Sequence, residues 1–179
     1  MKLRELYQKT AKPALKEKFG YTNEMAVPKI LKVSLNVGVG RYTKDKTYLE
    51  NVANNLARIT GQKPIMAKAK KSISAFKVRE GTVIGVAVTL RGERMFDFLQ
   101  KLIDVTFPRV RDFRGIGDGK LDKTGNLSIG FKEHIAFPEI KADEVDNVHG
   151  LEVNISTSAK TREEGLELFR LLGFPFKKD

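Results

Sequence analysis

The chain has 179 residues, and its 41% hydrophobic and 31% charged residues are typical of a folded domain, which excludes a disordered protein. Its 33 Lys and Arg residues outnumber 22 Asp and Glu residues, so the net charge is +11 and we expect a polyanionic partner, either nucleic acid or an anionic membrane. The absence of cysteine excludes disulfides and thiolate metal sites, and no apolar run reaches the ~20 residues of a membrane span or forms a signal peptide. We therefore expect one cytoplasmic domain, residues 1–179, with no membrane partner.

The first half of the chain is expected to alternate helices and strands. An N-terminal helix comes first, and Pro13 kinks or divides it. Residues 29–37 then alternate with the period of a β-strand. The apolar residues that share one face of this strand are Leu31, Val33, Leu35 and Val37. Apolar residues at helical spacing over 49–59 predict a helix capped by Gly61, and a short strand candidate follows Gln62.

The second half contains three more strands and two more helices. The stretches that alternate between apolar and other residues are 83–91, 127–131 and 151–158. The inward residues expected in the first of these are Ile84, Val86, Val88 and Leu90. A helix that includes Met95 is expected to stop before Pro108. The last helix should begin after the N-cap Thr161, with Glu164 completing a capping box, and end near Gly173.

This order of elements predicts an α+β fold, ferredoxin-like in style, with an antiparallel or mixed sheet. Because each strand has one apolar face, the helices should cover one side of the sheet and leave an open polar face. Small residues keep that open face low: Gly85, Ala87, Ser128 and Gly130. Such a face would allow a flat ligand to approach the sheet closely, but an ordinary solvated sheet face is an equally good interpretation of the pattern.

The sequence offers no catalytic constellation. The two histidines, His134 and His149, lack carboxylate or cysteine ligands at metal spacing, so each is better explained as a surface or hydrogen-bonded residue. The glycine-rich stretches near residues 38–43 and 114–121 do not match a phosphate-binding motif. We therefore expect no enzyme, no metal and no cofactor. A metabolic enzyme with a phosphorylated substrate stays a formal alternative, and it would need a catalytic residue that the sequence does not provide.

The distribution of charge is more informative. Residues 63–91 contain seven basic residues and one acidic residue, a net charge of +6. The loop near 67–81 lacks a sustained apolar period, so we expect it to be mobile until it binds its partner. Its basic residues are Lys68, Lys70, Lys71, Lys77 and Arg79. Small residues and Ser72 lie between these cations and allow close approach to phosphates, and Phe76 offers a stacking surface. The clustering favours a nucleic-acid contact over a solvated loop.

Two further segments differ in charge. Arg109 and Arg111 precede a glycine-rich stretch, and the loop near 114–126 is predicted to be a flexible projection. Residues 139–152 are acidic instead, with a net charge of −4. An acidic patch on a basic protein often faces a basic protein, although a solvated loop explains it equally well.

Several blocks of the sequence resemble the bacterial large-subunit ribosomal protein L5 family. The blocks, in family order, are PKILKVSLNVGVG at 28–40, ITGQKP at 59–64, KAKKS at 68–72, TLRGERM at 89–95, FPRVRDFRG at 107–115, FPEI at 137–140 and LLGFPF at 171–176. They span nearly the whole chain, and such a series is far more specific than any single motif. Ala67 departs from the family, which often has Ser or Thr there, and this removes one possible hydroxyl contact to phosphate.

The resemblance implies a structural protein of the large ribosomal subunit that binds 5S rRNA and anchors it in the central protuberance. It also implies contact with 23S rRNA, the P-site tRNA, other 5S-binding ribosomal proteins and the small-subunit head protein S13. The residues expected to bind 5S rRNA, on the polar face or beside it, are Asn36, Gln62, Lys63, Thr89 and Arg91. The residues expected to contact tRNA are Lys68, Lys70, Lys71, Ser72, Phe76, Lys77 and Arg79. The residues expected at the small-subunit bridge are Arg109, Arg111, Asp143, Glu144 and Asp146. A free RNA-remodelling or translation-regulating factor is the alternative, and it should leave the large subunit in a high-salt wash.

Overall fold

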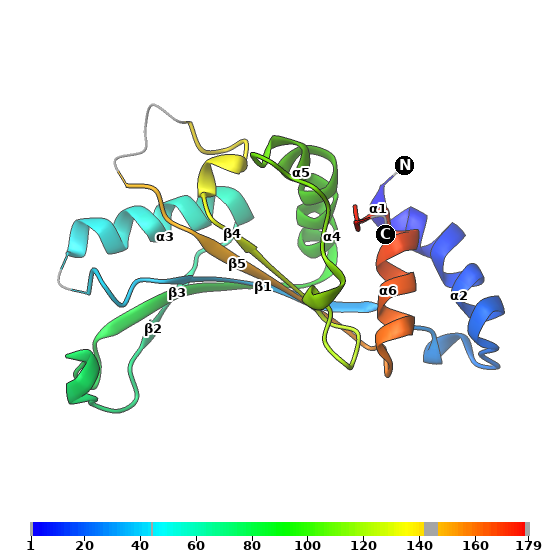
Figure 1. Ribbon diagram of the computed structural model, residues 1–179, viewed down its shortest axis with the longest axis horizontal. Helices are drawn as coiled ribbons and strands as arrows, with labels where there is room; N and C mark the ends of the chain where they lie inside the picture. The colour runs from blue at the N-terminus through cyan, green and yellow to red at the C-terminus, as the bar shows by residue number, and fades with distance from the viewer. Residues whose placement is uncertain (1, 44, 142–146, 178–179) are drawn as a thin grey trace. The chain divides into compact units, whose positions relative to one another are not determined.

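The computed structural model describes residues 2–43, 45–141 and 147–177, and the chain divides into two compact units (Figure 1). Unit 1 consists of Met1–Val33, Arg91–Ile129 and Asn154–Asp179. Unit 2 consists of Ser34–Leu90 and Gly130–Val153. Each unit is therefore assembled from segments that are far apart in the chain, so its core depends on long-range contacts.

Five strands form one sheet with the order β2-β3-β1-β5-β4. Their bounds are β1 Ile30–Gly38, β2 Ile65–Lys68, β3 Val83–Leu90, β4 Leu127–Phe131 and β5 Leu151–Thr157. β2 and β3 pair antiparallel, with Ile65 opposite Ala87, and a bulge between Ala67 and Lys68 shifts the register. The antiparallel sheet and its helices confirm the predicted α+β class.

Burial along the strands follows the predicted alternation, with two exceptions. β4 and β5 bury every second residue throughout, and β1 does so from Val33 onward. The expectation was wrong for Leu31, which is 47% exposed, and for Ile84, which is 38% exposed. At the start of β1 it is Ile30 that is buried, so the alternation slips by one residue before Val33. Both exceptions lie near the beginning of a strand, where an apolar side chain finds less cover.

In unit 2, α3 (Lys46–Thr60) packs on β3. Its N-terminus is capped by Asp45, whose carboxylate accepts the Tyr48 N–H at 3.0 Å. It ends at Gly61, whose φ of +66° confirms the predicted C-terminal cap. The buried side of α3 covers the apolar face of the strands. On the opposite side of β1 and β3, Asn36 is exposed and Ala87 and Thr89 are half-buried, whereas Gly85 is buried.

Unit 1 contains two helical runs in which a proline follows a π-helical turn. α1 (Leu3–Leu6) continues through the π turn Tyr7–Ala11 into α2 (Lys12–Phe19), which has Pro13 in its first turn. α4 (Gly92–Lys101) continues through the π turn Leu102–Thr106 into α5 (Phe107–Arg109), which includes Pro108. The expected stop before Pro108 is therefore wrong. The wider π turn changes the backbone partners ahead of the ring, so the missing N–H of the proline is tolerated.

The last helix, α6 (Arg162–Leu171), begins as predicted. The Thr161 hydroxyl accepts the Glu164 N–H at 3.3 Å, which confirms Thr161 as the N-cap. The Glu164 carboxylate in turn accepts the N–H of Lys160 at 2.7 Å, one residue earlier than in a standard capping box. Gly173, with φ of +86°, follows the helix.

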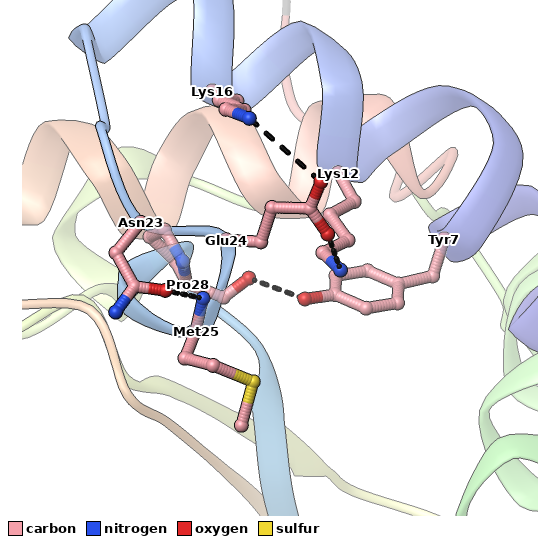
Figure 2. Close-up of polar contacts among 7 residues, drawn as sticks. All are labelled: Tyr7, Lys12, Lys16, Asn23, Glu24, Met25 and Pro28. Atoms are coloured by element: carbon pink, nitrogen blue, oxygen red, sulfur yellow. Dashed lines mark hydrogen bonds and ion pairs between the residues drawn. The ribbon is translucent and has the colours of Figure 1, made fainter.

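Polar contacts hold the N-terminal helical run against the segment that leads into β1 (Figure 2). Lys12 Nζ lies 2.8 Å and Lys16 Nζ 3.7 Å from the Glu24 carboxylate, and the Tyr7 hydroxyl donates to the Pro28 carbonyl at 3.1 Å. The hydrogen bond and charge of Lys12, with the charge of Lys16, lower the pKa of Glu24. Lys12 and Lys16 therefore form ion pairs within unit 1, although both count toward the net positive charge of the chain.

The loop near 114–126 is anchored and is not the flexible projection that its glycine content predicted. Ile116 is 4% exposed, and its N–H donates to the Pro175 carbonyl at 2.8 Å. Leu121 is also buried and pairs with Leu127. The Ile116 contact joins segments more than fifty residues apart, and the Leu121 contact pairs the loop with the first residue of β4. The glycine content of the loop does not reveal either contact.

Candidate nucleic-acid interface

The open face of unit 2 has Asn36 standing beside a glycine. Asn36 is exposed in β1, and Gly85 is its buried neighbour in β3. A Cβ placed at Gly85 would lie 3.5 Å from the Asn36 Oδ1 and 3.8 Å from the Ala67 Cβ. Small residues, Gly85 and Ala67, therefore form the surface beside Asn36, and the Asn36 amide oxygen lies in van der Waals contact with the Gly85 position.

Thr89 lies further along β3, and Gln62, in the turn between α3 and β2, is hydrogen-bonded to it. The Gln62 Nε2 donates to the Thr89 carbonyl at 3.1 Å. The turn that carries Gln62 is fixed by Thr60, whose hydroxyl donates to the Leu56 carbonyl at 2.7 Å. One amide hydrogen of Gln62 is therefore engaged inside the protein, and its remaining polar atoms and the Thr89 hydroxyl are left for a ligand.

The other two residues expected to bind 5S rRNA differ in their setting. Lys63 is exposed in unit 2, directly after Gln62. Arg91 is exposed as well, but it belongs to unit 1, where it is the N-cap residue of α4. Asn36 and Thr89 therefore lie on neighbouring strands, β1 and β3. Gln62 is hydrogen-bonded to the end of β3, with Lys63 directly after it, and Arg91 follows the last residue of β3.

The basic loop near 67–81 was expected to be mobile, but its backbone hydrogen bonds close it into a hairpin, and its first residues belong to β2. Ile73 and Val78 exchange backbone hydrogen bonds of 2.9 and 3.2 Å, and the Ala69 N–H donates to the Thr82 carbonyl at 2.8 Å. The Ser72 hydroxyl accepts the Glu80 N–H at 2.9 Å, so Ser72 helps to close the hairpin. We name residues 68–82 the basic hairpin.

The charged side chains of the basic hairpin all point to solvent. Its exposed cations are Lys68, Lys70, Lys71, Lys77 and Arg79. None of them forms an ion pair with a residue that the structure describes, and Phe76 is 75% exposed near the tip. Lys77 has a φ of +53°, a left-handed conformation that closes the short 3₁₀ turn Ser74–Phe76. Unpaired cations around an exposed ring form a surface that suits a polyanion with stacked bases.

Only two of the residues expected at the small-subunit bridge fall within the described residues. Arg109 and Arg111 are exposed at the end of the α5 run in unit 1. Asp143, Glu144 and Asp146 lie outside the described residues. The segments beside them are fixed: Ile140 is buried, and Arg58 donates to the Glu139 carbonyl at 2.8 Å.

The two histidines form a buried stacked pair that the sequence did not indicate. Their rings lie 3.9 Å apart and nearly parallel, at 5°, and the His149 N–H donates to the His134 Nδ1 at 3.2 Å. Burial lowers the pKa of both, and the neighbouring His134 adds to the effect on His149, whose pKa is about 4. Both rings are therefore neutral at pH 7, and the pair contributes to the core of unit 2.

The described residues lack both a membrane-spanning helix and a cluster of metal ligands. That part of the chain has no helix long and apolar enough to cross a bilayer. It also brings together no group of three or more His, Asp or Glu side chains able to hold a metal ion.

Comparison with known proteins gives one consistent result. Residues 23–79 match the family model described as ribosomal protein L5, and residues 83–176 match the model for the C-terminus of the same ribosomal family. The large ribosomal subunit protein uL5 of Halothermothrix orenii is 52% identical over 176 residues, covering 98% of each chain. The protein of the same name from Desulforapulum autotrophicum is 54% identical over 175 residues, and again 98% of each chain is covered. A third, from Colwellia psychrerythraea, is 51% identical over 177 residues, covering 99% of this chain and 98% of the relative.

The basic α+β fold and these matches define a structural ribosomal protein and not an enzyme. The chain belongs to the ribosomal protein L5 family. The resemblance seen in the sequence blocks is thereby confirmed.

Proposed function

We propose that this chain, a structural constituent of the large ribosomal subunit, holds 5S rRNA on the open face of unit 2. The observation that carries the proposal is the exposed Asn36 amide, which stands beside a floor of small residues, Gly85 and Ala67. A sugar-phosphate backbone can approach such a floor closely, and Asn36 and Thr89 can bond to phosphate or to a ribose 2′-hydroxyl. Lys63, exposed beside Gln62, adds a phosphate contact at the end of β3.

Recognition on this face should depend on folded RNA shape. The exposed large side chain on this face of β2 is Ile65, which lies opposite Ala87, and it is aliphatic. Without an aromatic pair, the face does not suit splayed single-stranded bases, whereas a folded backbone can follow its donors. Attachment of 5S rRNA in the central protuberance, alongside 23S rRNA and other 5S-binding proteins, is part of the same proposal.

The basic hairpin is proposed to contact the P-site tRNA. None of its five exposed cations forms an ion pair with a described acidic group, and Phe76 is exposed near its tip. The backbone bonds between Ile73 and Val78 hold the tip in shape, so little order has to be gained on binding. The acidic stretch at 143–146, with Arg109 and Arg111, is proposed to bridge to the small-subunit protein S13.

The test of the main proposal uses the purified chain and 5S rRNA. Asn36→Ala and Thr89→Ala should each weaken binding by about 1 to 3 kcal/mol, because a buried RNA partner is left unpaired. Asn51→Ala is the matched control, since Asn51 is exposed on α3 and away from the open face. If both face variants keep the wild-type affinity for 5S rRNA and the wild-type melting temperature, the open face is not the binding surface and the RNA binds elsewhere on the protein.

A further inference from the structure

The loop between β1 and α3 presents a tyrosine ring that is supported on one side. The rings of Tyr42 and Tyr48 pack with their centroids 4.3 Å apart and their planes tilted by 37°. Tyr48 is 7% exposed, whereas Tyr42 is 49% exposed. Tyr48 is itself fixed, because it is buried and its N–H donates to the Asp45 carboxylate at 3.0 Å. The inner face of Tyr42 is therefore occupied, and its other side is in solvent.

The backbone of Tyr42 is also fixed. Its N–H donates to the Val39 carbonyl at 2.9 Å, and its carbonyl accepts the Asp45 N–H at 3.1 Å. Val39 in turn donates to the Ile84 carbonyl of β3 at 3.0 Å. A ring held in this way loses little freedom when a second flat group stacks on it, so stacking would be favourable.

The charge around the ring is positive. Arg41 and Lys46 are exposed on either side of Tyr42 in the chain, and neither is paired with an acidic group among the described residues. Asp45, the carboxylate between them, accepts the Tyr48 N–H. The loop leaves the sheet beside Ile84, at the same end of unit 2 as the basic hairpin (Figure 1). A polyanion that reaches the hairpin thus meets a second basic site at this end.

We propose that Tyr42 is a stacking site for an unpaired nucleobase of large-subunit ribosomal RNA, with Arg41 and Lys46 binding the phosphates beside that base. A base inside a duplex already has neighbours on both faces, so a lone protein ring selects a flipped or looped-out base. The two cations, which form no ion pair with a described residue, favour RNA over an apolar protein surface. The site rests on the proposed RNA-binding function, but it lies in the β1–α3 loop and not on the open face.

A simpler role for the ring is to cover Tyr48, and two substitutions separate the roles. Tyr42→Leu keeps an apolar cover over Tyr48 but removes the flat aromatic face. Tyr42→Phe keeps both the cover and the face. Binding of each variant to protein-free 5S rRNA and to protein-free 23S rRNA is measured at several salt concentrations, with the melting temperature of each variant as a control for folding.

For the RNA that stacks on Tyr42, the Leu variant should bind about 5- to 150-fold more weakly, the range expected for one stacked base. The Phe variant should bind within about twofold of wild type, and the salt slope should stay unchanged because no phosphate contact is lost. Ultraviolet irradiation of the wild-type complex should cross-link residue 42 to the RNA.

The proposal is overturned if the Leu variant binds both RNAs as wild type does, or if no cross-link forms at residue 42. It is also overturned if RNA affinity is unchanged while subunits carrying Tyr42→Leu lose a neighbouring protein. Asn36→Ala is measured in parallel: if it weakens 5S binding and Tyr42→Leu weakens neither RNA, the stacking site alone fails. If neither Asn36→Ala nor Thr89→Ala has an effect, the open-face function fails independently of Tyr42.

Discussion

Gly165→Ala should destabilise the protein although it improves helix propensity. Gly165 is buried within α6, and a Cβ at this position would lie 2.5 Å from the Gly125 carbonyl oxygen and 2.8 Å from its carbonyl carbon. Both are backbone atoms, so no side chain can rotate away. Helix and loop therefore meet at a contact that only glycine permits.

The loop that contains Gly125 cannot shift away from α6 without losing hydrogen bonds. The Thr157 hydroxyl donates to the Gly125 carbonyl at 3.0 Å, and the Thr157 N–H donates to the Asn126 Oδ1 at 2.8 Å. The Asp122 carboxylate accepts the Asn126 N–H at 2.7 Å. Moving Gly125 aside would therefore break hydrogen bonds that fix the turn before β4.

The magnitude is set by two opposing effects. Replacing Gly by Ala inside a helix is worth about 1 kcal/mol in favour of the variant. Overpacking of a well-fixed contact costs about 1 to 3 kcal/mol, and the rigid backbone on both sides puts this case at the upper end. We therefore expect a net loss of about 2 kcal/mol, which for a chain of this size lowers the melting temperature by about 4 to 8 °C.

Urea unfolding followed by circular dichroism measures this loss. Gly117→Ala is the control, because a Cβ there meets nothing within 4 Å, and it should change the free energy of unfolding by less than about 0.5 kcal/mol. A Gly165→Ala variant as stable as wild type, or more stable, would refute the reasoning and show that helix propensity outweighs the contact.

Three further predictions concern charge. Changing Lys68, Lys70 and Lys71 together to Ala should speed dissociation of P-site tRNA from ribosomes and lower the salt slope by about 2 to 3, and unchanged dissociation would exclude the basic hairpin as a tRNA contact. Burial depresses the pKa of His149 to about 4, so below about pH 6.5 the unfolded chain binds a proton that the native state does not bind. The contribution of His149 to the free energy of unfolding is therefore complete above that pH, and this free energy should be about 2 kcal/mol lower at pH 5. In urea unfolding at both pH values, a His149→Phe variant should lose most of this pH dependence. Reversing Asp143, Glu144 and Asp146 to Lys should slow subunit joining at low salt, and equal joining rates would argue against a bridge at this stretch.

Features set by neighbouring residues were predictable from the sequence. The Gly61 cap, the Thr161 N-cap and the inward residues of β4 and β5 depend on side chains within a few positions, and all were confirmed. The polar face with Asn36 and Thr89 followed from alternation in the same way. Local patterns carry these features because the interactions that produce them are local.

Features set by distant residues were not predictable. The 114–126 loop has the composition of a flexible segment, but Ile116 is anchored to the segment after α6. The internal hydrogen bond of Gln62 needs the position of the Thr89 carbonyl, which lies 27 residues away. The Tyr42–Tyr48 and His134–His149 pairs span six and fifteen residues, at no periodic spacing, so no pattern indicates them.

The π turns of unit 1 also set the rotational phase of the helical residues that come after them. A π turn contains one residue more than an α turn, and each added residue rotates the rest of the helix by about 100°. After the turn Leu102–Thr106, Phe107 is buried and Arg109 is exposed. Deleting one residue from that turn would restore a regular helix, but it would swing Phe107 toward solvent and turn other side chains of the α5 run inward. The extra residue therefore determines which side chains of the α5 run face the core. We expect the chain to tolerate substitutions in this turn far better than a change in the length of the turn.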